Sequence, residues 1–327
     1  MKQIPYGRQY IDQNDIESVS KALKKDLITS GSEVINFEKK IINYLKCKYS
    51  TVCNSGTSAI LLALLSIGLK KNDVVIMPSI TFIASYNMAS FLGAKIYLAD
   101  VNKISGQMSP EDVERCCKKF KLKKIKAIIT MYNGGYPENV YNFYKLKKKF
   151  GCYLIEDACH ALGAEYKFNK KFYKIGSCKH SDISTFSLHP LKTITTGEGG
   201  IVTSNSKNLD KKIKSFRSLG IKKNNNYHWK YNVSLIGFNF RLNEFQCALG
   251  ISQLNKIKSF LSFRKKIALK YNQELKKISS LVIPEYENKN KSAYHLYLIS
   301  IKNFNLQKKN KFIKFMKSKG IFVQYHY

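Results

Sequence analysis

The sequence lacks the features that mark a membrane or secreted protein. No apolar run approaches the roughly 20 residues that a bilayer-spanning helix needs. The opening residues, MKQIPYGRQYIDQNDIESV, contain no apolar signal core. The 327-residue chain is nevertheless 44% hydrophobic, which is typical of a globular protein with a substantial core. We therefore expect a cytoplasmic protein without a membrane partner.

Acidic residues and arginines are both scarce. There are 22 acidic residues against 56 basic ones, and the net charge of +34 could suit a nucleic-acid partner. Only five of the 56 basic residues are Arg, however, the side chain that most often reads bases and grips phosphates. The lysines are spread along the chain, and no helix-turn-helix, zinc-finger or RNA-binding motif occurs. The pattern favours a solvated basic surface over nucleic-acid binding, and its field would attract an anionic substrate.

Metal-ligand spacing is absent as well. The eight cysteines include no CxxC pair, and the two nearest to each other are adjacent. We therefore expect free thiols, most of them small buried hydrophobic residues, and no metal site.

The sequence does contain a regular alternation of short apolar runs and helical stretches. Runs without polar interruption suit strands that are buried on both faces, as in parallel sheets covered by helices. Seven such runs occur, at 50–54, 73–79, 95–101, 126–132, 152–158, 182–188 and 199–205. They predict an α/β fold with a mainly parallel sheet and helices on both faces, in which a ligand binds beyond the carboxyl ends of the strands.

The last part of the chain has a different pattern. A polar helix over about 254–278 leads to YHLYLISI at 294–301, a basic helix at 306–320 and the strand-like IFVQYHY. We predict a large domain over 1–250, which includes an N-terminal arm, and a small α+β domain over 251–327. Because the chain stops on a strand-like stretch, we expect the small domain to be incomplete.

A first candidate site follows the apolar run at 50–54. Gly56, Thr57 and Ser58 begin a helix, where free backbone amides and hydroxyls can hold an anion. An ordinary N-cap explains the same residues. No GK[ST] follows, so the stretch is not a P-loop.

A second candidate site lies at the end of the run at 152–158. Asp157 closes the run, and His160 follows three residues later. A carboxylate in this place can face a cationic nitrogen of a ligand, and a histidine ring can contact the ligand's face or a polar substituent. Taken alone, an N-cap aspartate and a hydrogen-bonded core histidine are the simpler explanations.

A third candidate site is the stretch FSLHPLKTITTGEGGIV. Lys192 lies between a predicted strand and a cluster of glycines. A lysine at the mouth of a sheet can lose its proton and form a Schiff base with an aldehyde. Ser187, five residues earlier, could bind phosphate. In so lysine-rich a chain, an ordinary surface lysine is the simpler explanation for Lys192 alone.

Together the three stretches fit one ligand. An anion, a pyridinium nitrogen and an aldehyde describe pyridoxal phosphate (PLP). The stretches and their order resemble the sugar aminotransferases of the DegT/DnrJ/EryC1/StrS family. The resemblance covers nearly the whole chain, including MPSITFIASYNMASFLGAKIYLADV and IGFNFRLNEFQCALGISQLNKI. It implies a PLP-dependent transferase of fold type I, a homodimer whose active site is shared between the subunits.

The resemblance also implies roles for individual residues. Lys192 would bind the cofactor aldehyde and shuttle protons. Asp157 would pair with the pyridine nitrogen, His160 would lie by the ring oxygen, and Phe82 would stack on the ring. The other implied cofactor-binding positions are Gly56, Thr57, Ser58 and Ser187 from the same subunit and Asn239 from the other subunit.

Within the family, three stretches resemble the enzymes of the pathway to pseudaminic acid: FSLHPLKTITTGEGG, YHLYLISI and GIFVQYHY. Those enzymes aminate carbon 4 of a UDP-linked 4-keto-6-deoxy-N-acetylhexosamine, with glutamate as donor. Thr193, where Pro is common, and the turn MYNGGYPEN depart from the pattern.

Other functions stay open. Another nucleotide-linked keto-sugar, as in perosamine or 4-amino-arabinose synthesis, is an alternative substrate, and an inactive cofactor-binding paralogue is an alternative to an enzyme. The sugar dehydratases of the family carry His at the lysine position, and Lys192 argues against that activity.

Overall fold

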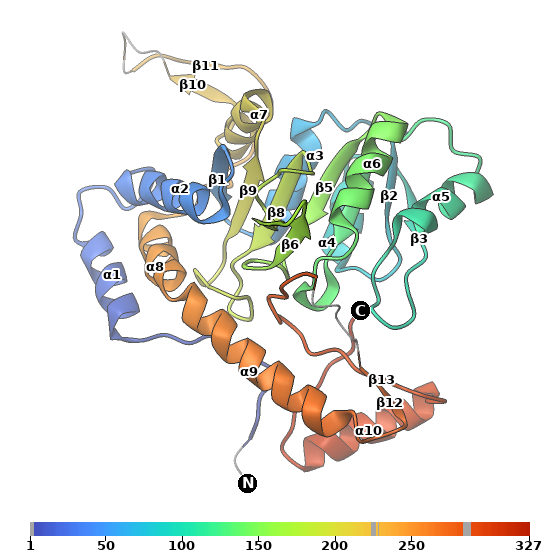
Figure 1. Ribbon diagram of the computed structural model, residues 1–327. Coiled ribbons are helices and arrows are strands. Elements are labelled where there is room, and N and C mark those ends of the chain that lie inside the picture. Colours follow the sequence, from blue (N-terminus) through green and yellow to red (C-terminus); the bar gives the residue numbers. More distant parts are fainter. Residues whose placement is uncertain (1–2, 224–226, 228, 284–288) are drawn as a thin grey trace.

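The computed structural model describes residues 3–223, 227, 229–283 and 289–327. Its centre is a seven-stranded sheet in the order β1-β9-β8-β5-β4-β2-β3 (Figure 1). The strands are β1 (Tyr49–Cys53), β2 (Val74–Pro78), β3 (Lys95–Ala99), β4 (Ala127–Met131), β5 (Tyr153–Asp157), β8 (Ile183–Ser187) and β9 (Gly200–Ser204).

The seven predicted strands are all present, and the sheet is mainly parallel. From β8 to β3 every neighbouring pair is parallel, whereas β9 is antiparallel to both β8 and β1. The carboxyl ends of β2, β4, β5 and β8 therefore meet at one edge of the sheet.

Helices cover both faces of the sheet, as the sequence predicts. The helices are α1 (Gln13–Leu23), α2 (Ser32–Leu45), α3 (Gly56–Ser66), α4 (Ile83–Phe91), α5 (Pro110–Lys119), α6 (Val140–Phe150), α7 (Lys207–Arg217), α8 (Glu244–Asn255), α9 (Ile257–Leu275) and α10 (Leu306–Ser318), with a 3-10 turn, η1, at Asn133–Gly135. Ile129 of β4 packs in one core with α3, α4 and α7, and the adjacent Ile128 packs in another with α5 and α6. Because successive side chains point to opposite faces, the run is apolar throughout.

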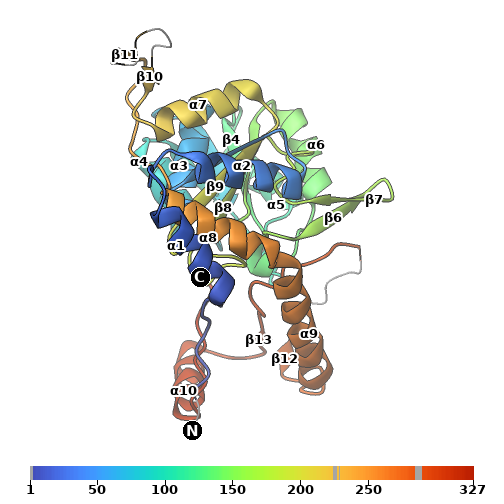
Figure 2. The ribbon, with the colours of Figure 1, turned by 90° about the vertical axis from the view of Figure 1, so that its left-hand side faces the viewer.

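Three small two-stranded sheets complete the fold, and of their strands only the one at Ser300–Ile301 lies in a stretch for which a strand was predicted. They are β6 (Glu165–Phe168) with β7 (Lys171–Lys174), β10 (Ile221–Lys223) with β11 (Tyr231–Val233), and β12 (Leu281–Val282) with β13 (Ser300–Ile301). The β6–β7 turn places Asn169 and Lys170 at φ 45° and 63°, which is typical of a two-residue hairpin turn. The β10–β11 hairpin projects from the body of the molecule beside α7 (Figures 1 and 2).

The C-terminal region has both predicted helices. The helix expected over about 254–278 is present as α9, at Ile257–Leu275, and a separate helix, α8, ends just before it at Asn255. Most of α8 is buried, so it lacks the one-sided apolar pattern that marks a surface helix. The basic helix is present as α10.

The stretch YHLYLISI is not a strand along its length. Only Ser300 and Ile301 pair, as β13. The amides of His295 and Leu296 instead donate to the carbonyl oxygen of Gly134, in the turn after β4. The strand-like stretch at 321–327 contributes a single bridge, between Ile321 and Ile4.

The region that follows α8 lies beside the sheet and not within its layers. α9, α10, β12 and β13 extend away from the sheet in both views (Figures 1 and 2). The predicted domain boundary at residue 250 falls inside α8, and the division into two domains stays a prediction. Among the described residues, no helix combines the length and the apolar character needed to cross a membrane.

Candidate active site

The three predicted stretches converge on the carboxyl edge of the sheet. Asp157 ends β5 and aligns with Met131 of β4 and Thr185 of β8. Ser187 ends β8, and the turn from β1 into α3 lies directly against it. The register of the sheet thus brings together residues that are far apart in sequence.

The start of α3 is built around a serine pair. Ser55 is the N-cap, and its hydroxyl accepts from the Ser58 amide at 3.0 Å and lies 2.9 Å from the Ser58 hydroxyl. A Cβ at Gly56 would lie 2.8 Å from Cβ of Ser187, so only glycine allows this approach. Thr57 is exposed. The first amides of a helix have no acceptor inside it, and here two chain segments with hydroxyl groups flank them.

Asp157 is a buried carboxylate without a cationic partner among the described residues. It is 2% exposed, and it accepts from the Ser85 hydroxyl at 3.3 Å and the Cys159 amide at 3.2 Å. A buried carboxylate with only neutral donors is suited to a ligand cation.

The neighbouring carboxyl group, Glu156, points to the other face of the sheet and is fully supplied with donors. The hydroxyls of Tyr132, Ser181 and Ser184 donate to it. Burial raises the pKa of Glu156 in spite of these bonds. Of the two adjacent acids, Glu156 is thus satisfied by the protein itself, and Asp157 has capacity left for a ligand.

His160 lies in a group of rings at the same edge. It is 3% exposed, and its Nε2 is 2.8 Å from the Tyr327 hydroxyl. Its Nδ1 is buried and has no hydrogen-bond partner among the described residues. Burial, with the nearby charges of Lys192 and His326, holds the pKa of His160 well below its ordinary value. The ring is therefore neutral at physiological pH.

Lys192 is held by the turn between β8 and β9. Its amide donates to the carbonyl oxygen of His189 at 2.8 Å, and the side chain is half-buried. The Thr195 hydroxyl donates to the carbonyl oxygen of Leu188 at 2.9 Å and accepts from the Gly197 amide at 3.0 Å. These bonds fix the turn, so Lys192 is presented on a rigid loop.

Phe82 stands at the opening of the site as the N-cap of α4. It is 50% exposed, and its ring centroid lies 5.8 Å from that of Tyr327. The Tyr327 ring is thus close to two of the predicted site residues, Phe82 and His160.

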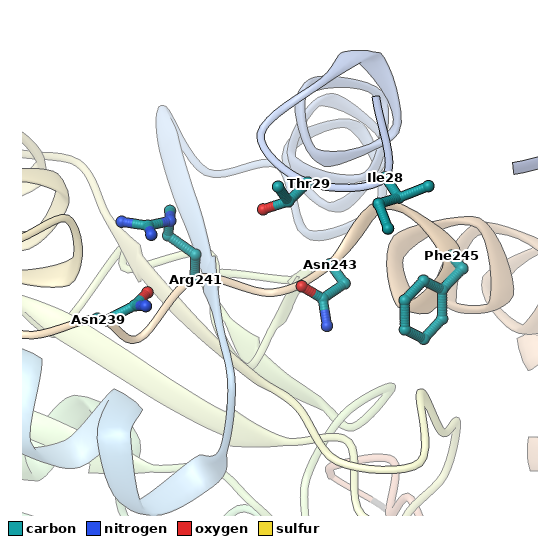
Figure 3. A pocket seen from close by; sticks show the side chains of 6 residues that line it. All are labelled: Ile28, Thr29, Asn239, Arg241, Asn243 and Phe245. Carbon is teal, nitrogen blue, oxygen red and sulfur yellow. The ribbon is translucent and has the colours of Figure 1, made fainter. Parts of the chain in front are cut away.

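Asn239 is the one predicted residue that lies in a separate place. Its side chain is exposed and lines an open hollow of about 410 Å³ (Figure 3). The other lining residues are Ile28, Thr29, Arg241, Asn243 and Phe245. The next residue, Phe240, accepts from the Asn54 amide at 2.9 Å, which joins this segment to the turn before α3. The role of Asn239 toward a second subunit stays a prediction.

Sequence reasoning missed several residues of the site. Ser85 contacts Asp157 from α4, and His295 lies against His160 with ring centroids 4.2 Å apart. The Tyr6 hydroxyl is 2.9 Å from Nε2 of His326. These residues come from distant parts of the chain, and no local spacing marks them.

The residues of this edge fit PLP. The hydroxyls and amides at the start of α3, with Ser187 beside them, suit a phosphate. The unpaired carboxylate of Asp157 suits a protonated ring nitrogen, and the orphan Nδ1 shows that His160 has a bond still to make. Lys192 supplies an amine within the electrostatic reach of His160.

The sheet order, with one antiparallel strand and helices on both faces, is that of PLP fold type I, as in the solved aminotransferase structure described below. The family model of the DegT/DnrJ/EryC1/StrS aminotransferases matches residues 9–327. The chain belongs to this family and is a sugar aminotransferase.

Similar proteins support that assignment. The UDP-4-amino-4,6-dideoxy-N-acetyl-beta-L-altrosamine transaminase of Campylobacter jejuni (strain 81-176) is 39% identical, over 99% of this chain and 83% of that protein. The GDP-perosamine synthase of Escherichia coli O157:H7 is 34% identical, over 92% of this chain and 78% of that protein.

A solved structure also matches the whole chain. PseC of Helicobacter pylori, an aminotransferase involved in the biosynthesis of pseudoaminic acid, aligns with a TM-score of 0.91 and 33% identity. The match covers 100% of this chain and 85% of that one.

Proposed function

We propose that this enzyme transfers the amino group of glutamate to carbon 4 of a UDP-linked 4-keto-6-deoxy-N-acetylhexosamine. The single observation that carries the choice of substrate is the 39% identity to the Campylobacter jejuni transaminase over 99% of the chain. We also propose a cytoplasmic homodimer, in which Asn239 reaches the phosphate of the cofactor in the other subunit.

We propose that the cofactor is PLP and that its phosphate is held by Gly56, Thr57, Ser58 and Ser187. Support comes from the close packing of Gly56 on Ser187 and from the serine pair at the start of α3. When bound, PLP supplies an aldehyde that carries the amino group and a ring that withdraws electrons from the reacting carbon.

Each remaining residue has a defined task. Lys192 would hold the cofactor aldehyde through Nζ. Once the amino group of glutamate takes that place, the released Nζ would accept the proton from the α-carbon of glutamate and deliver it to the cofactor. Asp157 keeps a proton on the ring nitrogen, because its carboxylate is buried and has only the neutral donors Ser85 and Cys159. The neutral His160 would hydrogen-bond the ring oxygen, and Phe82 would pack on the face of the ring.

The same groups serve the second half-reaction in reverse. Lys192 Nζ returns a proton while the keto-sugar takes the amino group at carbon 4. The excess of basic residues over acidic ones attracts the anionic nucleotide.

The first test compares wild type with Lys192→Ala and with Lys207→Ala, an exposed lysine at the start of α7. We expect wild type and Lys207→Ala to show the visible absorbance band of lysine-bound PLP, which glutamate removes. Lys192→Ala should lack the band. A band that persists in Lys192→Ala would disprove the assignment of the lysine.

The substrate is tested with the glutamate-treated enzyme and a panel of keto-sugars. The band should return with the UDP-linked N-acetylated sugar and with no GDP-linked one. A faster return with the GDP-linked 4-keto sugar would instead favour the activity named for the Escherichia coli relative.

A further inference from the structure

The turn after β4 is gripped by a segment from the far end of the chain. The amides of Ala293 and His295 donate to the carbonyl oxygens of Gly135 and Gly134, both at 2.9 Å. The Leu296 amide donates to the same Gly134 oxygen at 3.2 Å. Residues 293–296, here called the clasp, are thus joined to the sheet edge by three backbone hydrogen bonds.

The turn lies in direct contact with His160. Gly135 has φ +98°, and a Cβ there would lie 2.5 Å from the carbonyl oxygen of His160 and 3.2 Å from Cβ of Ala293. Gly135 is therefore sandwiched between the backbone of His160 and the clasp.

The clasp is also held from outside. Nη1 of Arg264, in α9, donates to the carbonyl oxygens of Tyr294 and His295 at 3.3 and 3.2 Å. One guanidinium nitrogen thereby fixes two successive peptide groups of the clasp. Tyr294 has φ +47°, an uncommon conformation for a residue with a side chain, which the bonds on both sides sustain.

The clasp ends in a contact between two histidine rings. The rings of His295 and His160 lie 4.2 Å apart between centroids and are inclined by 41°. The Nδ1 atoms of both rings are buried without a hydrogen-bond partner among the described residues. Burial, then the nearby ionisable groups His160, Lys192, Arg264 and His326, hold the pKa of His295 well below its ordinary value. Both rings are therefore neutral and can pack against each other.

We propose that His295 is a positioning residue, whose ring packs behind His160 and, through the clasp, ties the orientation of His160 to the region after α8. The proposal rests on the function proposed above, in which His160 contacts the cofactor. Among the described residues the His160 ring has one hydrogen bond, between Nε2 and the Tyr327 hydroxyl, and the ring contact with His295 is a second restraint on its rotation.

The test follows the histidine rings by NMR in the cofactor-free protein. The variants are His295→Ala, which removes the ring, and His295→Phe, which keeps a flat ring without nitrogens. We expect one set of His160 signals in wild type and His295→Phe, and exchange-broadened or multiple signals in His295→Ala. The pKa of His160 should rise toward its ordinary value of about 6.5 in His295→Ala, because water enters the space left by the ring.

The same variants are then assayed with PLP. His295→Ala should lose about 10-fold or more in kcat, with the KM for the amino donor changed less than about 3-fold, because His160 is misplaced while binding groups stay. His295→Phe should recover most of the loss. His180→Phe is a matched control, since His180 packs among Tyr141, Tyr144 and Tyr166 away from the clasp.

Unchanged His160 signals and an unchanged kcat in His295→Ala would overturn the proposal, and so would an equal loss in both variants. If His295→Ala does not fold, Arg264→Gln takes its place, because it frees the clasp without touching either ring. A wild type that forms no lysine-bound PLP band would refute the proposed function, whereas the NMR experiment would still decide whether His295 orients His160.

Discussion

The carboxyl edge of the sheet and the region after α8 are built on different principles. Strands such as β4 and β9 are buried along their whole length, and their side chains pack in cores on both faces. In α10 no residue is buried, and in α9 only Ile257 and Ala268 are. The comparison teaches that the sheet is stabilised by burial along its strands, whereas the later region adds only a few apolar side chains to that core and is otherwise joined to it by specific polar contacts such as those of the clasp.

The sharpest test of this contrast compares two phenylalanines. Phe186 in β8 is 0% exposed and Phe315 in α10 is 55% exposed. Phe186→Ala should lower the free energy of unfolding by about 3–5 kcal/mol, because it leaves a cavity. Phe315→Ala should change it by less than about 0.5 kcal/mol. Urea unfolding measures both, and equal losses would show that α10 is covered as tightly as the core.

A second prediction concerns the place where the two regions meet. Gly135→Ala should destabilise the protein by about 2–3 kcal/mol, because its Cβ would lie 2.5 Å from the His160 oxygen and its φ is +98°. Gly151→Ala is the control, since its φ is +61° and no atom lies within 4 Å of the added Cβ. It should lose about 1 kcal/mol from backbone strain alone. If Gly135→Ala and Gly151→Ala lowered the midpoint of thermal unfolding by the same amount, the close contact with His160 would be refuted.

A third prediction concerns the outer hold on the clasp. Arg264→Gln should raise the hydrogen-exchange rates of the Ala293 and His295 amides by about 10-fold, because two carbonyl groups of the clasp lose a charged donor worth about 1.5 kcal/mol. Arg115→Gln is the control, because Arg115 is exposed on α5 and forms its ion pair with Asp112, three residues earlier in the same helix. Unaltered exchange in Arg264→Gln would show that the clasp does not depend on α9.

The smallest expected effect comes from breaking an ion pair across the same boundary, between Glu165 and Lys291. Glu165 of β6 lies 2.7 Å from Nζ of Lys291 and 3.0 Å from Nζ of Lys174. Burial works to raise the pKa of Glu165, but the hydrogen bonds from the two lysines outweigh it and hold the pKa below its ordinary value. A carboxyl group whose pKa is lower in the folded state than in the unfolded state stabilises the fold at pH values above its unfolded-state pKa. This stabilisation is lost as the pH falls through the folded-state pKa.

Lys291→Met should therefore lower the free energy of unfolding by about 0.5 kcal/mol at neutral pH, since the lysine is largely exposed. The difference from wild type should vanish in acid, once Glu165 is protonated. Urea unfolding at the two pH values checks this. A difference that persisted in acid would come from the contact of Lys291 with the Phe172 ring, 4.1 Å from Nζ to the ring centroid, or from packing of its stem, and not from the ion pair with Glu165.

Sequence reasoning succeeded where the pattern was local. The strands β5 and β8 were predicted from the short β-rich runs at 152–158 and 182–188, and the structure has them at 153–157 and 183–187. It failed at YHLYLISI, because the amides of His295 and Leu296 both bond to Gly134, about 160 residues earlier in the chain. Nothing in the stretch itself distinguishes that bonding from strand pairing.

The candidate site divides in the same way. The helix start after β1 and the lysine loop after β8 follow from short segments whose caps and glycines are legible in the sequence. The sequence by itself thus determined the strands, the helix start that suits an anion and the lysine that follows a strand. Only the tertiary structure decided that Ser85 reaches Asp157 and that His295 packs on His160. The physical reason is that apolar periodicity and capping act over a few residues, whereas contacts between distant side chains depend on how the sheet register and the packed helices bring their elements together.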